Sequence, residues 1–422
     1  MSPWKLNPFY VLYNNFNKRN IILNKIRDDS IVEILQVCPV FYPAWHRGGT
    51  VRIAYNLSKN LVSKGYNVTT YTTDSLDQNS RIKFDSNPYN IDGINVYYFK
   101  NISNFLASGY HLPIPLKMHN HIKKEIKNFD IIHLHDYRHS LNIIMHHYAS
   151  KYDIPYILQP HGSTLRVGKK GFKWLFDNMF GYKIFKDASR VIAVSKEEED
   201  YDKKMGIFNG KIEVIYNGMD LEPFKNLPKY GNFRKKHNID NNKIMILFLG
   251  RINKSKGIDF VIRTFSKLVK EINNVCLVIA GSDDGFKVKL EKLIEELNIG
   301  DIVKFTGFVN EADKISAYVD ADLFVHTVRY MGGVGLTPLE AILCDTPVIV
   351  TEGCGEVIKE ANAGYIVKFS DEDDFKEKMI RLIKNPDEGN EMVERGKEYI
   401  LKNLTWDNAM SKVLKIYSEC VQ

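Results

Sequence analysis

Two cations follow an apolar run in the second half of the chain. The run at residues 244–249 (IMILFL) ends at Gly250, and Arg251 and Lys256 lie on the segment that follows. Such a run predicts a buried parallel strand, and ligands bind at the carboxyl ends of the strands in open α/β sheets. Arg offers a planar fork of donors and Lys a point charge, so the two side chains suit a diphosphate. A solvated loop with two surface cations is an equally simple interpretation.

A glycine-rich segment leads into a predicted helix further along the chain. Residues 330–340 read YMGGVGLTPLE, with three glycines before the expected helix start. Backbone N–H groups and the positive end of a helix dipole would face an anion there. The segment also reads as a capping box, with Thr337 as the N-cap and Glu340 returning to its N–H. A capping Glu340 needs no ligand, and the two roles coexist only where one carboxylate oxygen is free.

A histidine follows a predicted strand in the first half. His161 lies in residues 159–163 (QPHGS), just beyond the strand expected at 156–159. It would either serve a ligand at the strand end or be a loop histidine with a satisfied hydrogen bond. Other histidines cluster nearby in sequence: His133, His135, His139, His146 and His147. We expect no metal site from them, because the first two lie on a strand and the last two on a helix.

These residues sit within alternating predicted strands and helices. A strand at 31–39, a turn with Gly48 and Gly49, a helix at 51–64 and a strand at 66–72 form a doubly wound unit. Further strands are expected at 94–99, 131–134, 156–159, 190–194 and 212–215. A second series contains strands at 244–249, 275–280, 303–306, 323–326 and 347–351, separated by helices at 258–269, 288–297, 312–319 and 337–343.

The length requires more than one core, since the chain has 422 residues and single cores stop growing near about 250–300. Residues 221–242 are polar and follow the turn Asn217-Gly218, which we take as the domain boundary. The sequence therefore predicts an α/β protein of two tandem Rossmann-like domains facing each other across a cleft. Their expected bounds are 31–217 and 218–404, after an extension at 1–30, with the segment 405–422 completing the first domain.

Composition and charge exclude several classes of protein. The chain is 44% hydrophobic and 26% charged, as in soluble globular proteins. Residues 1–217 carry 29 Lys and Arg against 19 Asp and Glu, and residues 218–422 carry 29 against 32. This asymmetry argues against a uniformly basic nucleic-acid coat. Five cysteines without a CxxC pair favour reduced thiols, and neither a secretory signal nor a membrane-length apolar run is evident, so we expect a cytoplasmic protein.

Common nucleotide and hydrolase motifs are missing from the sequence. Neither Gly48-Gly49 nor Gly250 belongs to a GxGxxG turn followed by an acidic residue, which disfavours a dehydrogenase. No Walker A or GxSxG pattern occurs either, which disfavours kinase, ATPase and α/β-hydrolase chemistry.

Nine short segments together carry a resemblance to a known family. The chain resembles the retaining nucleotide-sugar glycosyltransferases of the GT-B fold, called family four or group one, from residue 31 onward. Any one segment is weak, but their order and spacing are highly specific. The segments are 48–52 (GGTVR), 130–136 (DIIHLHD), 159–163 (QPHGS), 188–195 (ASRVIAVS), 214–220 (VIYNGMD), 250–257 (GRINKSKG), 280–281 (AG), 305–308 (FTGF) and 335–348 (GLTPLEAILCDTPV).

The resemblance implies catalytic roles for three residues. Arg251 and Lys256 would hold the donor diphosphate and stabilise it as it leaves. His161 would hydrogen-bond the donor sugar from the opposite domain, and the loop with Gly48 and Gly49 would close over the phosphates. The acceptor would be held by the N-terminal domain, and the sugar transferred with retention of anomeric configuration.

The resemblance also implies a donor site without a bound metal. Glu340 would bind the nucleotide ribose, and the main chain near Phe308 and Val309 would contact the base. Backbone N–H groups would contact the donor phosphate and sugar at Gly333, Val334, Gly335 and Leu336. The expected donor is a UDP- or GDP-sugar, and no cofactor is expected.

One residue departs from the family pattern. The family has a pair of glutamates separated by seven residues, and the position of the first, counted back from Glu340, is Gly332. Because that Glu normally touches the donor sugar, sugar recognition must differ here. The departure motivates a second interpretation, a catalytically impaired subunit that binds a nucleotide sugar or glycan for a partner. A nucleotide-sugar epimerase or a phosphorylase on the same fold is a third.

A lysine- and aromatic-rich segment bears on the acceptor. Residues 169–176 (KKGFKWLF) and 183–186 (KIFK) interleave aromatic residues with cations over a predicted helix. Interfacial membrane helices have this composition, and so do ordinary amphipathic helices with aromatics in the core. In the first case the acceptor is a lipid-linked or anionic glycan, and the protein is peripheral on the inner membrane face.

Overall fold

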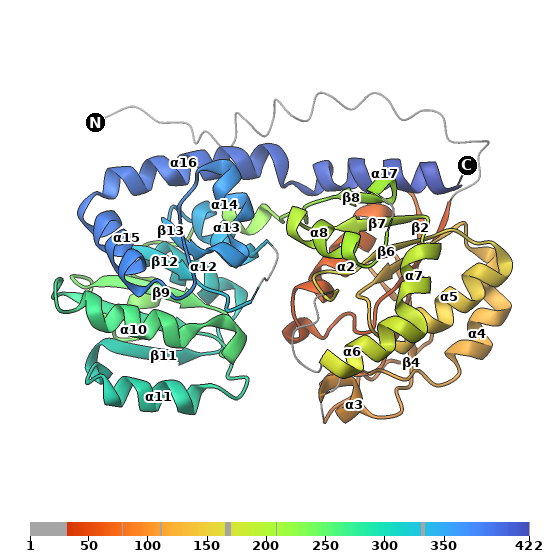
Figure 1. The fold of residues 1–422 in the computed structure, drawn as a ribbon, viewed down its shortest axis with the longest axis horizontal. Coiled ribbons are helices and arrows are strands. Elements are labelled where there is room, and N and C mark those ends of the chain that lie inside the picture. The colour runs from red at the N-terminus through yellow and green to blue at the C-terminus, as the bar shows by residue number, and fades with distance from the viewer. Residues whose placement is uncertain are drawn as a thin grey trace. The chain divides into compact units, whose positions relative to one another are not determined.

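The computed structural model describes residues 32–77, 79–109, 112–164, 170–207, 209–330 and 334–421. They form two compact units, drawn in Figure 1: residues 32–219 with 406–421, and residues 220–405. The first unit is discontinuous in sequence, because helix α17 (Trp406–Val421) belongs to it. The expected extension at 1–30 lies outside the described residues.

The first unit is built on an eight-stranded sheet with the order β3-β4-β2-β1-β5-β6-β7-β8. All neighbouring strands pair in parallel except β3, which pairs antiparallel with β4 at the edge. The strands are β1 (Glu33–Val37), β2 (Asn67–Thr73), β3 (Tyr89–Ile91), β4 (Ile94–Phe99), β5 (Ile131–His135), β6 (Tyr156–Gln159), β7 (Arg190–Ala193) and β8 (Ile212–Val214).

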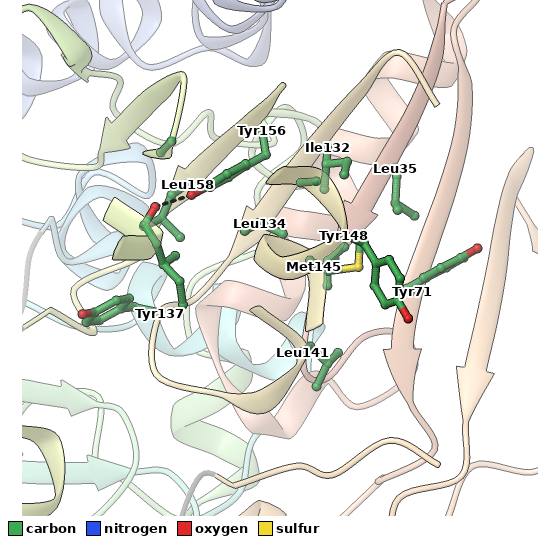
Figure 2. Close-up of a cluster of buried hydrophobic side chains, with 14 of the residues drawn as sticks. Leu35, Tyr71, Ile132, Leu134, Tyr137, Leu141, Met145, Tyr148, Tyr156 and Leu158 are labelled. Carbon is green, nitrogen blue, oxygen red and sulfur yellow. Dashed lines mark hydrogen bonds between the residues drawn. The ribbon is translucent and has the colours of Figure 1, made fainter. Parts of the chain in front are cut away.

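Helices cover both faces of this sheet, because its strands are apolar on both sides. Alternate residues of each strand face opposite ways: Ile34 packs with α2 and α17, whereas Leu35 packs with α4 and α5. Figure 2 shows the second of these cores, in which strand residues such as Leu134 meet α5 residues such as Met145. The helices are α2 (Gly49–Ser63), α3 (Asn104–Gly109), α4 (Met118–Glu125), α5 (Ser140–Tyr152), α6 (Lys170–Phe176), α7 (Tyr182–Asp187) and α8 (Lys196–Lys204), with α17.

The second unit contains a six-stranded parallel sheet with the order β11-β10-β9-β12-β13-β14. Its strands are β9 (Ile244–Leu249), β10 (Val275–Ala280), β11 (Val303–Gly307), β12 (Leu323–His326), β13 (Val348–Thr351) and β14 (Tyr365–Val367). Its helices are α9 (Asn232–Lys236), α10 (Ile258–Leu268), α11 (Lys287–Glu296), α12 (Glu311–Val319), α13 (Leu336–Leu343), α14 (Glu356–Ala361), α15 (Glu372–Lys384) and α16 (Pro386–Asn403).

Both sheets reverse direction beside their first strand. The chain runs outward from β1 to β2, then returns to place β5 on the other side of β1. In the second unit β9 lies between β10 and β12 in the same way, which is the strand order of doubly wound nucleotide-binding folds. Ligands bind at such switch points, beyond the carboxyl ends of the strands. The predicted α/β architecture of two parallel-sheet domains is confirmed.

The described helices include none that is long and apolar enough to cross a membrane.

Candidate active site

Three glycines lie where adjacent strands of the second sheet end. Gly250 follows β9, Gly281 follows β10, and Gly307 ends β11. The Gly250 N–H donates to the Ala280 carbonyl at 2.9 Å, and the Gly281 N–H donates to the Gly307 carbonyl at 2.8 Å. Gly281 has a φ of +146°. The backbones therefore approach closely at this edge, and a side chain at Gly281 would clash with the Gly250 backbone.

Arg251 begins the loop between β9 and α10. Its side chain is exposed, and its guanidinium nitrogen lies 3.3 Å from an Asp284 carboxylate oxygen that is exposed as well. An exposed pair of this kind contributes at most about 1 kcal/mol. Arg251 is therefore free to exchange this partner for a ligand anion at little cost.

Lys256 ends a 3-10 turn in the same loop, at Lys254–Lys256. The Asn253 side chain caps the turn by accepting the Ser255 N–H at 3.1 Å. The Thr327 hydroxyl, just after β12, donates to the Lys256 carbonyl at 2.6 Å and ties the loop to the switch point. Burial lowers the pKa of Lys256, and the nearby charge of Arg251 lowers it further. A bound anion beside this ammonium would raise the pKa again, because an opposite charge favours the charged form.

Gly257 follows the turn in a left-handed conformation with a φ of +63°. An ideal Cβ there would lie 2.4 Å from the Phe369 ring, so a side chain would displace the loop. The left-handed backbone and the nearby Phe369 ring together explain why a glycine follows Lys256.

His326, which sequence reasoning did not select, ends β12 beside the same loop. Its Nδ1 lies 3.1 Å from the Thr337 hydroxyl, and an ideal Cβ at Gly335 would lie 3.5 Å from its ring. Burial and the charge of Lys256 hold its pKa well below the ordinary value, so the ring is neutral. His326 therefore supports the start of α13 next to Lys256. The available signal was a histidine ending a predicted strand immediately before the glycine-rich segment.

Glu340 lies on α13, and the predicted capping box is wrong. The N-cap of α13 is Gly335, and Thr337 lies inside the helix with its hydroxyl on His326. The Glu340 carboxylate instead accepts hydrogen bonds from the Lys314 ammonium at 2.8 Å and the Tyr318 hydroxyl at 2.9 Å. Tertiary partners on α12 thus replace the local cap.

The Glu340 carboxylate changes the acidity of both partners. Burial alone would lower the pKa of Lys314, but the charges of Glu340 and Glu311 raise it above its ordinary value. Burial, together with Glu340, raises the pKa of Tyr318 well above its ordinary value. Both partners therefore remain protonated donors, and a ligand that uses Glu340 must share its carboxylate with them.

The remaining predicted donor residues lie at the same edge. Phe308 follows β11 with its side chain 73% exposed, and Val309 is half-buried beside it. Val334, Gly335 and Leu336 lead directly into α13. Gly333, and Gly332 before it, lie outside the described residues.

In the first unit, Gly48 and Gly49 follow β1 at the start of α2. Gly48 is the N-cap with a φ of +118°, and Gly49 is the first helical residue. The backbone N–H groups of the first turn of this helix of 15 residues have no partner within the helix and point toward its N-terminal side. The glycine pair thus opens a helix at the carboxyl edge of the first sheet.

His161 lies at the same edge, just after β6, with a φ of +53°. Its Nε2 is 2.9 Å from Nδ1 of His135, the last residue of β5, and the two rings stack at 5.2 Å. Burial lowers the pKa of His161 to about 3, so the imidazole is neutral at physiological pH. The ring is thus a hydrogen-bonding group and not a cation.

Two buried carboxyl groups on α8, also not selected from the sequence, lie behind the His161 turn. Glu198 accepts the backbone N–H groups of Gly162 and Val194, and Asp202 is fully buried with both oxygens lacking a hydrogen-bond partner. Burial raises the pKa of both groups; the charge of Asp136 raises that of Glu198 further, and the charge of Glu198 raises that of Asp202. The Glu198 contact holds the turn that carries His161.

The histidines of the first half separate into two places. His133 and His135 stack at 4.5 Å within the sheet, whereas His146 on α5 pairs with Asp187 on α7 at 2.8 Å. Within the described parts of the chain, no group of three or more His, Cys, Asp or Glu side chains has metal-binding geometry.

Comparison with known proteins identifies the family. Residues 47–223 match the model of Glycosyltransferase Family 4, and residues 230–399 match that of Glycosyl transferases group 1. An uncharacterized glycosyltransferase of Methanocaldococcus jannaschii is 29% identical over 395 residues, which cover 89% of this chain and 95% of that protein.

Two solved structures share the fold. Sucrose-phosphate synthase from Thermosynechococcus elongatus superposes with a TM-score of 0.72 at 18% identity, over 92% of this chain and 98% of that one. Anabaena HepE in complex with UDP and glucose gives a TM-score of 0.72 at 16% identity, over 92% and 100%. The chain therefore belongs to the GT-B glycosyltransferases, with a family-four domain followed by a group-one domain.

Proposed function

We propose that this protein transfers a sugar from a nucleoside diphosphate sugar to a glycan or lipid-linked acceptor, with retention of anomeric configuration and without a bound metal. The donor is a UDP- or GDP-sugar. The acceptor hydroxyl attacks the anomeric carbon from the face that the diphosphate leaves, and the hydroxyl proton goes to the departing phosphate.

One observation carries this proposal: Arg251 lies close enough to Lys256 for its charge to disfavour the charged form of the lysine. Burial and Arg251 together lower the pKa of Lys256, so the loop is short of negative charge. A diphosphate supplies that charge, and charge grows on it as the glycosidic bond breaks. The two cations therefore bind the leaving group more tightly in the transition state than in the ground state.

The other residues of the second unit suit the rest of the donor. The N-terminal turn of α13, at Gly335 and Leu336, would donate backbone N–H groups to phosphate and sugar oxygens. Glu340 would accept from the ribose hydroxyls while keeping its bonds to α12. Phe308 and Val309 would place main-chain groups beside the base. With cations and a helix N-terminus in these roles, the chemistry needs no metal ion.

The first unit supplies the remaining proposed groups. His161, neutral because burial lowers its pKa to about 3, would hydrogen-bond the donor sugar without adding charge. Gly48 and Gly49 would bring the N-terminal turn of α2 to the phosphates. The Anabaena HepE structures contain UDP, glucose and UDP-glucose, which supports testing UDP-sugars first.

Helix α6 and its continuation support a membrane-bound or anionic acceptor. Phe176 and Phe185 are buried in the core of the first unit, but Trp174 on the same segment is 57% exposed. Other apolar side chains of this segment are also exposed: Phe172, Leu175, Met179 and Tyr182. Part of this segment is thus an ordinary amphipathic helix with aromatic residues in the core, and part exposes apolar side chains as an interfacial membrane helix does. A half-exposed Trp beside lysines suits the interface of an anionic bilayer.

A donor screen with a matched pair of variants tests the sugar transfer. Wild-type protein should show a thermal shift with one nucleotide sugar of a panel, since a ligand of the native state raises stability. Arg251→Ala should lower the turnover by about a hundredfold or more, as for loss of one preorganised donor. Arg263→Ala, an exposed cation on α10, should leave it unchanged. Near-normal turnover of Arg251→Ala contradicts the proposal.

Analysis of the reaction products distinguishes sugar transfer from the other functions considered because Gly332 replaces a glutamate. Nuclear magnetic resonance of the product should show the anomeric configuration of the donor. Binding of the donor with neither transfer nor slow hydrolysis would instead indicate a binding subunit. A changed sugar in the donor alone would indicate an epimerase, and transfer to inorganic phosphate a phosphorylase.

Sedimentation with vesicles tests the proposed membrane surface. Protein should sediment with phosphatidylcholine vesicles that contain phosphatidylglycerol, and less with phosphatidylcholine alone. Changing Trp174 and Leu175 to Ser should abolish the sedimentation, and so should neutralising Lys169, Lys170 and Lys173, of which Lys169 lies outside the described residues. Val288→Ser, an exposed apolar residue of the other unit, is the control. Equal sedimentation of all variants contradicts a membrane role for α6.

A further inference from the structure

A chain of buried side chains connects the C-terminal helix α17 to His161. The Tyr417 hydroxyl lies 3.0 Å from Gln36 Nε2, and Gln36 Oε1 lies 2.5 Å from His135 Nε2. His135 Nδ1 in turn lies 2.9 Å from His161 Nε2. Gln36, His135 and Tyr417 are all buried. The chain crosses from α17 through β1 and β5 to the turn after β6.

The Gln36 amide sets the direction of the hydrogen bonds. Gln36 Oε1 can only accept, so His135 carries its proton on Nε2 and donates it to Gln36. Burial and nearby histidines hold the pKa of His135 well below its ordinary value, so its other nitrogen is a bare acceptor. The hydrogen bond between the two rings is therefore donated by His161 Nε2 to His135 Nδ1.

Tyr417 holds that amide in place. Gln36 Nε2 donates to the Tyr417 oxygen, which leaves the tyrosine proton for Nδ1 of His133 at 2.7 Å. His133 must then carry its own proton on Nε2. Burial lowers the pKa of His133 to about 3, so this ring is neutral and can accept the tyrosine proton on Nδ1.

The three rings lie nearly parallel to one another. The interplanar angle is 11° between His133 and His135 and 16° between His135 and His161. Glu198 fixes the turn after His161 by accepting the Gly162 N–H. The imidazole of His161 is thus restrained in both position and proton placement.

We propose that Tyr417 and Gln36 are positioning residues that fix His161 as the tautomer protonated on Nε2, so that Nδ1 is an acceptor for a hydroxyl of the donor sugar. The role of His161 rests on the proposed function, but its tautomer does not. The network makes α17, which follows the whole donor domain in sequence, part of the support of a residue in the first domain. The other tautomer would offer an N–H to the sugar and could not accept from its hydroxyl.

Long-range proton–nitrogen spectra of histidine-labelled protein test the tautomer directly. Comparison with His161→Ala assigns the His161 signals, which should show a protonated Nε2 and a bare Nδ1 near neutral pH. Tyr417→Phe and Gln36→Met should both give mixed tautomers at His161. Both should also lower kcat by about fivefold to tenfold, the value of one hydrogen bond, with the donor KM little changed.

A second buried tyrosine provides the matched control. The Tyr98 hydroxyl donates to the Tyr42 carbonyl at 2.6 Å in the same core cluster as Tyr417 but outside the histidine chain. Tyr98→Phe should lose similar stability and keep the wild-type His161 spectrum and kcat.

The outcomes separate the network from the function. A wild-type His161 that is protonated on Nδ1 overturns the inference, and this test needs no variant at the network residues. An unchanged His161 spectrum in Tyr417→Phe overturns it as well. A changed tautomer in Tyr417→Phe, together with full activity of His161→Ala, would support the network and reject the proposed role of His161.

Discussion

The carbonyl oxygen of Gly250 occupies the space that a side chain at Gly281 would need. An ideal Cβ on Gly281 would lie 1.9 Å from that oxygen. Gly250 and Gly281 directly follow the paired strands β9 and β10. Neither backbone can therefore move without breaking the sheet edge that carries Arg251. The position of the loop that begins at Arg251 therefore depends on the absence of a methyl group at Gly281.

Gly281→Ala should displace this edge. The clash with backbone and the φ of +146° both oppose alanine, so we expect a loss of about 2 kcal/mol or more in the free energy of unfolding. UDP binding should weaken as well, because the Arg251 loop shifts. Urea unfolding and calorimetric titration measure the two effects. Gly300→Ala, which meets nothing within 4 Å, should match wild type in both, and a similarly mild Gly281→Ala would show that the edge can adapt.

Lys256→Met should weaken UDP binding by at least about tenfold, as for loss of a charged hydrogen bond. Lys254→Met, two residues away and exposed, should have little effect. Burial and Arg251 lower the pKa of Lys256. As the pH rises, the UDP affinity of the wild type should therefore begin to fall at a lower pH than an ordinary lysine would cause. Calorimetric titration at rising pH measures this fall. The same titration of Lys256→Met shows how much of the pH dependence comes from the nucleotide itself. If UDP affinity falls equally with pH in both proteins, Lys256 does not have the proposed role.

Glu340→Gln should reduce the preference for ribose over deoxyribose. The variant keeps the size of the side chain but loses the charge that Lys314 and a ribose hydroxyl would share. Tyr318→Phe removes one hydrogen bond to Glu340 and leaves its charge, so UDP affinity should be retained. The measurement is the ratio of Kd values for UDP and 2′-deoxy-UDP. A ratio that is the same in wild type and Glu340→Gln contradicts ribose binding by Glu340.

Asp202→Asn should make the protein more tolerant of high pH. Burial, reinforced by Glu198, raises the pKa of Asp202, so the folded state holds a proton that the unfolded state has lost above about pH 4. Stability contributed by the protonated form is therefore lost as pH rises from that value toward the folded pKa. The variant's advantage should grow by up to about 1.4 kcal/mol per pH unit in this window.

Urea unfolding between about pH 7 and pH 9 checks the Asp202 prediction, since buried histidines with lowered pKa values are neutral there in both states. Asp200→Asn, exposed on the same helix, should follow the wild-type curve. An Asp202→Asn curve parallel to wild type would mean that the buried carboxyl does not hold its proton.

Strands were predictable from the sequence because their signal is local. A buried parallel strand is an apolar run, and the runs at 94–99 and 244–249 coincide with β4 and β9. The edge strand β3, with only three residues and an exposed, polar start, has no such signal and was not predicted. Helix ends shifted by one or two residues: the helix expected at 51–64 is α2 at Gly49–Ser63.

Contacts distant in sequence were not predictable in the same way. The Thr337 to Glu340 pattern satisfies the local rule for a capping box, but His326 and Lys314 offer those side chains other partners. The contact of His135 with His161 has another origin, because His135 ends β5 and His161 follows the adjacent strand β6. Strand order was the missing information, and it is a property of the whole sheet.

The discontinuous first unit has a consequence for synthesis on the ribosome. Helix α17 completes the core over β1 and β5 and is translated only after residues 220–405 of the other unit. At about 5–20 residues per second, those roughly 190 residues take about 10–40 s. During that interval this face of the first sheet, with its apolar strand residues, is covered by α2 but lacks α17. The nascent protein should therefore depend on chaperones until α17 emerges, while the second unit can already fold.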